Sequence, residues 1–123
     1  RERDLLRVVD DQVGAPTWAR WIAGATAACL AQARGDPAGL LAERGGLYHL
    51  ACAGETTWYG FARLLLSVAG EGTHARLLPI PTTEYPTPAR RPASSRLDCR
   101  HLARAFGVQL PAWELGVRLC FEG

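Results

Sequence analysis

The sequence predicts an α/β fold in which short strands alternate with about four amphipathic helices. Two patterns in the sequence predict this class. Short runs of Val, Leu and Ile indicate strands, and the longer segments between them have apolar residues at every third or fourth position, which indicates helices. The length of 123 residues is that of one domain, and a chain of this size buries roughly two-thirds of the surface that it exposes when unfolded. We therefore expect residues 1–123 to form a single domain.

The first two elements are expected to be a short strand and a long helix. Residues 6–9 are mainly apolar and β-branched, which favours a strand. Residues 17–34 carry apolar side chains at helical spacing, and Thr17 is a plausible N-cap because its hydroxyl can accept a backbone hydrogen bond. Residues 35–37 (Gly-Asp-Pro) stop this helix, and the segment that continues to residue 46 is expected to be an irregular loop.

A second strand and a second helix are expected in the middle of the chain. The strand covers residues 47–51, and it would bury His49 in the core. Thr56 or Thr57 then caps a helix over residues 58–69. The buried stripe of this helix is expected to consist of aromatic and aliphatic side chains, namely Trp58, Phe61, Leu64, Leu65 and Val68.

The last third of the chain is expected to begin with a strand and end with two helices. Residues 76–80 form an edge strand, because the proline within it cannot donate a hydrogen bond to a ladder. A helix over residues 99–106 has Asp98 as its N-cap and Gly107 as its left-handed C-cap. A final helix follows over residues 111–121. The side chains that it buries are expected to be Trp113, Val117 and Cys120.

The segment between this strand and these helices, residues 86–98, is here called the arginine loop. Its three prolines exclude a helix or a paired central strand. Three arginines (Arg90, Arg91 and Arg96) lie in it together with two serines. Guanidinium groups bind phosphate or carboxylate through paired hydrogen bonds, so the loop is suited to hold an anion. The alternative is a stiff connection whose arginines face water or pair with acidic residues.

The composition excludes several classes of function. All 14 basic residues are arginine, so these residues contain neither a Schiff-base lysine nor a P-loop lysine. A net charge of +2 with dispersed arginines does not favour a nucleic-acid-binding surface. No apolar run approaches the roughly 18 residues of a membrane span. No glycine-rich phosphate cradle is present either.

The four cysteines are expected to be reduced thiols in a cytoplasmic protein. They lie far apart without a CxxC pair, which argues against a zinc site. The first residues are charged and include no methionine or apolar signal sequence, which argues against disulfides formed on secretion. The same observation leads us to expect that the chain is part of a longer protein.

Several motifs together resemble the dTDP-4-dehydrorhamnose reductase family of extended short-chain dehydrogenases. The most specific is Tyr-Pro-Thr-Pro-Ala-Arg-Arg-Pro at residues 85–92, followed by Ser-Arg-Leu at residues 95–97. The remaining motifs occur in the order expected for the family, at residues 9–17, 46–50, 57–59 and 110–114. The resemblance therefore covers nearly the whole chain.

The resemblance implies that this chain is the substrate-binding lobe of a two-lobed reductase. Family members use NADPH, or sometimes NADH, to reduce dTDP-4-dehydro-6-deoxy-L-mannose to dTDP-L-rhamnose, a precursor of bacterial cell-surface polysaccharide. Their amino-terminal Rossmann domain contains the glycine-rich cofactor motif and a Tyr-xxx-Lys catalytic pair. These residues include neither the motif nor any lysine, so the chain alone is expected to be inactive.

The resemblance also implies which residues contact the dTDP-sugar substrate. Arg91 is the first candidate for the diphosphate, by analogy with related extended dehydrogenases, and Arg90 is the second. Asp11 and Gln12 are expected near the mouth of the cleft between the two lobes. Some members form homodimers that bind magnesium through glutamates at the interface. Arg20 occupies the corresponding position in the first helix, which argues against that metal site here.

Two other interpretations remain open from the sequence. Some relatives in the superfamily keep the fold and act as non-catalytic regulatory or interaction subunits. The chain is otherwise a fragment without an independent function, whose apolar surface would then be exposed and favour self-association.

Overall fold

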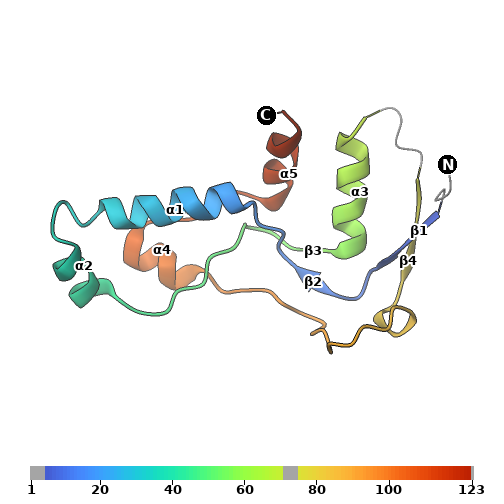
Figure 1. Ribbon diagram of the computed structural model, residues 1–123, viewed down its shortest axis with the longest axis horizontal. Coiled ribbons are helices and arrows are strands. Elements are labelled where there is room, and N and C mark those ends of the chain that lie inside the picture. The colour runs from blue at the N-terminus through green and yellow to red at the C-terminus, as the bar shows by residue number, and fades with distance from the viewer. Residues whose placement is uncertain (1–4, 71–74, 123) are drawn as a thin grey trace.

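The structure is a computed structural model that describes residues 5–70 and 75–122. Helices and short strands are mixed along the chain, in the order β1 (Leu5–Val9), β2 (Val13–Gly14), α1 (Ala19–Ala31), α2 (Pro37–Arg44), β3 (Thr56–Thr57), α3 (Trp58–Val68), β4 (Arg76–Ile80), η1 (Thr82–Glu84), α4 (Arg100–Phe106) and α5 (Trp113–Glu122). Helices α1, α2 and α4 lie at one end of the molecule and α3 lies with β1 and β4 at the other, while α5 stands between them (Figure 1). The predicted mixed α/β class is confirmed.

Strands β1 (Leu5–Val9) and β4 (Arg76–Ile80) pair in parallel along their full length. The last pair in the register joins Val9 to Ile80, and both side chains are buried. Both strands were predicted, and β4 is an edge strand because this sheet has two strands in the part of the chain that the structure describes. Parallel pairing brings the turns after the two strands to the same edge of the sheet.

Helix α1 (Ala19–Ala31) begins one residue later and ends about three residues earlier than predicted, and Trp18 rather than Thr17 is its N-cap. The Thr17 hydroxyl donates to the Ala15 carbonyl oxygen (2.9 Å) and accepts from the Cys52 backbone N–H (3.1 Å). The predicted cap is therefore wrong, because a distant backbone group occupies the hydroxyl. This contact connects the start of α1 to the segment that precedes β3.

Helix α2 (Pro37–Arg44) occupies the segment that was predicted to be a loop. The Asp36 carboxylate accepts a hydrogen bond from the Gly39 N–H (2.9 Å), and a proline is favourable at the first helical position because no hydrogen bond is lost there. The prediction was wrong because α1 already ends at Ala31, and Asp36 with Pro37 begins a new helix instead of stopping the previous one. Arg44 then donates to Gln32 (3.1 Å) and to the Ala105 carbonyl oxygen (3.2 Å).

Residues 47–51 do not form the predicted strand. No strand pairs with them in the described part of the chain, so the side chains of Leu47 and His49 face solvent instead of a core. The expected burial of His49 is therefore wrong. The backbone next pairs at Ala53, which donates to Pro111 (3.0 Å) and accepts from Trp113 (3.1 Å).

Helix α3 (Trp58–Val68) packs against the core of the molecule. The core centres on Cys52, Trp113 and Val117, and the predicted stripe residues that pack against it are Phe61, Leu64, Leu65 and Val68. Trp58 was also expected in this stripe, but its side chain is 58% exposed. It is the first residue of the helix and lies beyond the core contact, so that part of the prediction is wrong.

Helices α4 (Arg100–Phe106) and α5 (Trp113–Glu122) complete the chain. Gly107 adopts the left-handed conformation (φ 66°) after α4, as predicted. Asp98 is not the N-cap of α4, because Cys99 takes that position and the Asp98 carboxylate accepts from the Arg100 N–H (3.0 Å).

The cysteines are unbonded thiols, and Cys120 on α5 is exposed instead of buried as predicted. The faces of α5 explain this, since its buried residues are Trp113, Gly116 and Val117. None of the described helices is long and apolar enough to cross a membrane.

Candidate functional site

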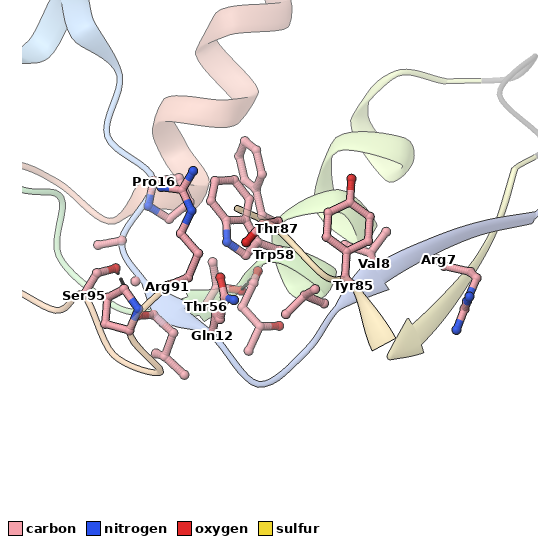
Figure 2. Close-up of a pocket in the computed structure, with 17 residues that line it drawn as sticks. Arg7, Val8, Gln12, Pro16, Thr56, Trp58, Tyr85, Thr87, Arg91 and Ser95 are labelled. Carbon is pink, nitrogen blue, oxygen red and sulfur yellow. Dashed lines mark hydrogen bonds between the residues drawn. The ribbon is translucent and has the colours of Figure 1, made fainter. Parts of the chain in front are cut away.

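A pocket of about 860 Å³ lies where the turn after β1, the start of α3 and the arginine loop meet. Strands β2 (Val13–Gly14) and β3 (Thr56–Thr57) pair antiparallel beside it. Figure 2 shows Arg91 and Trp58 near Gln12 and Thr56, Tyr85 further along beside Val8, and Arg7 apart at one end. The lining residues are Arg7, Val8, Val9, Gln12, Val13, Gly14, Ala15, Pro16, Thr56, Thr57, Trp58, Phe61, Tyr85, Thr87, Arg91, Pro92 and Ser95.

The turn after β1 is fixed to the turn after β4 by polar side chains. The Asp11 carboxylate accepts from both the backbone N–H (2.9 Å) and the hydroxyl of Thr82, which begins the short 3₁₀-helix η1 (Thr82–Glu84). The Gln12 side-chain amide donates to the same hydroxyl (3.1 Å). The two hydrogen bonds from Thr82 lower the pKa of Asp11, and the bond from the hydroxyl has the larger effect. The carboxylate is therefore ionised when the two turns are joined.

The arginine loop is attached to β2 through the backbone. The Val13 N–H donates to the Ala93 carbonyl oxygen, and the Ser95 N–H donates to the Val13 carbonyl oxygen, each at 2.8 Å. Strand β2 therefore lies between β3 on one side and the arginine loop on the other. This attachment places Arg91 and Pro92 on the wall of the pocket.

Thr57 fixes the other wall of the pocket. Its hydroxyl oxygen accepts from the Gly60 N–H (3.0 Å), which caps α3, and its hydroxyl donates to the Asp10 carboxylate after β1. The next residue, Trp58, has an edge-to-face contact with Phe61, with the ring centroids 6.5 Å apart. The exposed indole of Trp58 thus lines the pocket at a position that is set by the helix cap.

Arg91 is the arginine of the pocket wall whose charge remains available. It makes no hydrogen bond or ion pair with another side chain within the described residues, whereas Arg96 donates to Glu55 (2.8 Å) and Arg7 pairs with Glu84. Arg90 also lacks such a partner in the described part, but it does not line the pocket.

The structure brings two of the four candidate binding residues together at this pocket. Arg91 and Gln12 line it, while Arg90 lies outside the lining and the Asp11 carboxylate is occupied by Thr82. Trp58 and Tyr85 also line the pocket, and our sequence interpretation assigned neither a binding role. A signal for each was present in the sequence. Tyr85 begins the motif at residues 85–92, and Trp58 directly follows the capping threonine, so it is the first residue of α3 and lies outside the helix face that packs on the core.

The chemistry of the lining is that of a binding site. The described lining residues include no histidine, cysteine or carboxylate, and Tyr85 is the one lining residue of a type that commonly acts as a general acid or base. It offers instead one available guanidinium, several hydroxyl groups and an amide, and two aromatic rings more than half exposed. A ligand with an anionic group and a flat ring matches this set.

Comparison with known proteins decides the family. The model of the family described as RmlD substrate binding domain matches residues 1–123. This chain belongs to the RmlD substrate-binding domain family. The match covers the whole length of the chain, so every element and every pocket residue described above falls within the RmlD domain.

Similar proteins are dTDP-4-dehydrorhamnose reductases. The reductase of Burkholderia thailandensis is 46% identical over 127 residues, which cover 98% of this chain and 42% of the relative. Solved reductases from Clostridium acetobutylicum (TM-score 0.80) and from Bacillus anthracis in complex with NADP (TM-score 0.78) are each 28% identical. Each alignment covers 98% of this chain and 39% of the solved chain. The RmlD domain thus spans about two-fifths of the length of these relatives.

The chain lacks the sequence features that usually hold a dinucleotide. The chain has no glycine-rich phosphate turn and no lysine, and the pocket lining contains Gly14 but no run of glycines that would cradle a pyrophosphate. The described residues also contain no group of three side chains suited to hold a metal ion. Arg20, at the position considered for a magnesium-binding glutamate, is exposed and lies 5.7 Å from the Trp18 ring centre.

Proposed function

We propose that this RmlD domain binds the dTDP-sugar substrate of a dTDP-4-dehydrorhamnose reductase. The complete protein would reduce dTDP-4-dehydro-6-deoxy-L-mannose to dTDP-L-rhamnose with NADPH. The family membership and the names of the relatives support this proposal. The remaining three-fifths of a protein of that length would supply the Rossmann domain and the Tyr-xxx-Lys pair, and residues 1–123 would act as one binding unit in the cytoplasm.

The observation that carries the proposal is the available guanidinium of Arg91 in an otherwise largely apolar pocket. A planar guanidinium forms two parallel hydrogen bonds with phosphate oxygens, and the interaction is stronger where apolar walls reduce the contact with water. Arg91 would therefore bind the diphosphate. The position of Arg90 outside the lining makes it the weaker candidate, as the sequence motif also suggested.

The aromatic residues would hold the nucleoside part of the ligand. Trp58 and Tyr85 are 58% and 56% exposed, and both line the pocket, so their ring surfaces are open to a planar base or to the apolar face of a sugar. Gln12 supplies an amide oxygen that is not used by its bond to Thr82. The volume of about 860 Å³ lies within the range of sites for ligands of this size.

Substrate binding here would serve a reaction that takes place on the other lobe. The nicotinamide cofactor supplies a hydride when it is bound, and this chain lacks the glycine-rich turn that usually holds its phosphates. Their role is to anchor the nucleoside diphosphate so that the keto sugar extends from the pocket in one orientation. Such remote binding energy lowers the barrier by positioning the reacting carbon.

The proposal is tested with the full-length gene product that contains residues 1–123. We expect oxidation of NADPH that depends on the dTDP-keto sugar, together with binding of dTDP. Binding of dTDP without oxidation of NADPH would favour a non-catalytic subunit. Absence of both would contradict the proposed function.

A further inference from the structure

We propose that Glu84 and Glu55 are positioning residues, which hold the two ends of a strap formed by residues 85–92 and so determine where Arg91 and Tyr85 meet the ligand. The inference rests on the proposed function, because it concerns the same pocket. It adds two acidic residues that lie outside the pocket lining and that no ligand needs to touch.

The first end of the strap is held at β1. Glu84 is the last residue of η1, directly before Tyr85, and its carboxylate pairs with the Arg7 guanidinium. Arg7 lies on β1 and both side chains are about half exposed. Together with the Asp11–Thr82 hydrogen bonds, this pair fixes η1 at both of its ends. The start of the strap is thereby tied to the two-stranded sheet.

The second end of the strap is held beside β3. Arg96 donates to the Glu55 carboxylate (2.8 Å) through one guanidinium nitrogen and to the Ser94 hydroxyl (3.0 Å) through Nε. Glu55 directly precedes β3. The two backbone hydrogen bonds of Val13 lie next to this pair and fix residues 93–95. The end of the strap is thus tied to both β2 and the residue before β3.

Between these two ends, residues 86–92 have no hydrogen bond to the remainder of the described chain, whereas the Tyr85 N–H still donates to the Thr82 carbonyl oxygen (3.0 Å) at the first end. The side-chain bond within residues 86–92 joins the Thr87 hydroxyl to the Ala89 carbonyl oxygen, both inside the strap. Three prolines restrict its backbone, so it resists internal bending. A stiff segment without attachments along its length takes its position from its ends, and four pocket-lining residues (Tyr85, Thr87, Arg91 and Pro92) depend on that position.

The expected effect on ligand binding is moderate. Half-exposed ion pairs contribute little individually and are screened by salt. Each pair nevertheless limits the conformations of a strap whose ordering is otherwise a cost of ligand binding. We expect Glu84→Gln and Glu55→Gln each to weaken dTDP binding about three- to ten-fold at low salt, a fold-change of the size that such costs produce. The difference from the unmodified protein should decrease at high salt.

The test uses the full-length gene product and two measurements. Isothermal titration gives the dTDP affinity of Glu84→Gln, of Glu55→Gln and of the matched control Glu43→Gln, whose partner Arg44 lies on α2 away from the pocket. Limited digestion with trypsin gives the rate of cleavage between Arg90 and Arg91, which reports the mobility of the strap without any ligand. We expect both strap variants to bind less tightly and to be cleaved several-fold faster, and the control to match the wild type.

A charge exchange separates positioning from general damage to the fold. The double variant Glu55→Arg with Arg96→Glu should recover most of the affinity that Glu55→Arg alone loses. Wild-type affinity and wild-type cleavage in both glutamine variants would overturn the inference, as would an exchange that restores nothing. Faster cleavage in a protein that does not bind dTDP would support the tethered strap while rejecting the proposed function.

Discussion

Arg91 differs from the other arginines around the pocket because no acidic side chain of the described chain neutralises it. Arg7 and Arg96 are paired with glutamates. Arg90 lies beside Arg91 in the sequence but outside the pocket lining. Arg91 therefore carries the available positive charge of the pocket wall. Its role in binding can be tested by substituting this one residue.

Substitution of Arg91 should weaken binding of the diphosphate in particular. Hydrogen bonds to charged groups contribute about 1.5–3 kcal/mol, so Arg91→Ala in the full-length protein should weaken dTDP binding roughly 10- to 100-fold. Thymidine, which lacks the phosphates, should bind both proteins equally. Isothermal titration with the two ligands gives this comparison.

Arg90→Ala is the matched control for this prediction. It removes the same side chain from the neighbouring position, and its effect on dTDP binding should be smaller than three-fold, in the range of a distant surface charge. Equal losses in the two variants would mean that the loop acts through its total charge and not through Arg91.

The ionisation of Asp11 should make the junction of the two turns sensitive to acid. Hydrogen bonds from Thr82 lower the pKa of Asp11 below its usual value of about 3.9. A carboxylate whose pKa is lower in the folded state stabilises the fold above its unfolded-state pKa, and this contribution is lost as the pH falls through the folded-state value. In Thr82→Val, which removes the hydroxyl, NMR titration should show the pKa of Asp11 rising toward the usual value. An unchanged Asp11 titration would contradict the assigned cause.

At the scale of the elements, Thr57 connects a helix cap to the strand end that precedes the pocket. Thr57→Ala removes the cap of α3 and the bond to Asp10, and it should lower the free energy of unfolding by about 1 kcal/mol. Thr57→Ser keeps the hydroxyl and should lose much less. Denaturant unfolding of the full-length protein measures both, and equal losses would show that the threonine methyl group and not the cap is responsible.

The elements that the sequence predicted correctly are those with local signals. Strands β1 and β4 and helices α1, α3, α4 and α5 combine an apolar periodicity with a turn or a cap that can be recognised over a few residues. Helix α2 was missed because Asp-Pro is compatible with both a helix stop and a helix start, and in the structure Asp36 and Pro37 only start α2, since α1 ends at Ala31. Residues 47–51 have strand composition, but strand formation depends on a neighbour that local sequence does not reveal.

The candidate site was predictable only in part for the same reason. The motif at residues 85–92 indicated Arg91, and the polar turn indicated Gln12. The hydrogen bonds of Asp11 come from Thr82, about 70 residues away in the sequence. The exposure of Trp58 depends on where the buried face of α3 ends. Local sequence shows neither. Long-range pairing of this kind decided which of the polar residues remained available to a ligand.

At the scale of the whole molecule, the RmlD domain exposes more surface than a compact monomer of its mass. Its accessible surface is 8986 Å², whereas a compact protein of 13.3 kDa exposes about 6,450 Å². The exposed apolar side chains include Leu30, Leu41, Leu47, Leu97 and Phe121. Because the chain spans about two-fifths of the length of its relatives, we expect further protein to cover part of this surface.

Residues 1–123 produced alone should therefore behave differently from the full-length protein. We expect the isolated domain to bind a hydrophobic dye strongly and to elute from size-exclusion chromatography as associated species, because its apolar surface lacks its cover. The full-length protein should bind little dye. A monomeric isolated domain with low dye binding would mean that the exposed surface needs no partner.

The central claim is that this domain holds a dTDP-sugar with its diphosphate on Arg91. The most direct measurement is a crystal structure of the full-length protein with dTDP. We predict phosphate oxygens within about 3 Å of the Arg91 guanidinium and the nucleoside against Trp58 or Tyr85 in the pocket. A structure with dTDP bound at another place, and with Arg91 directed to solvent, would contradict the account.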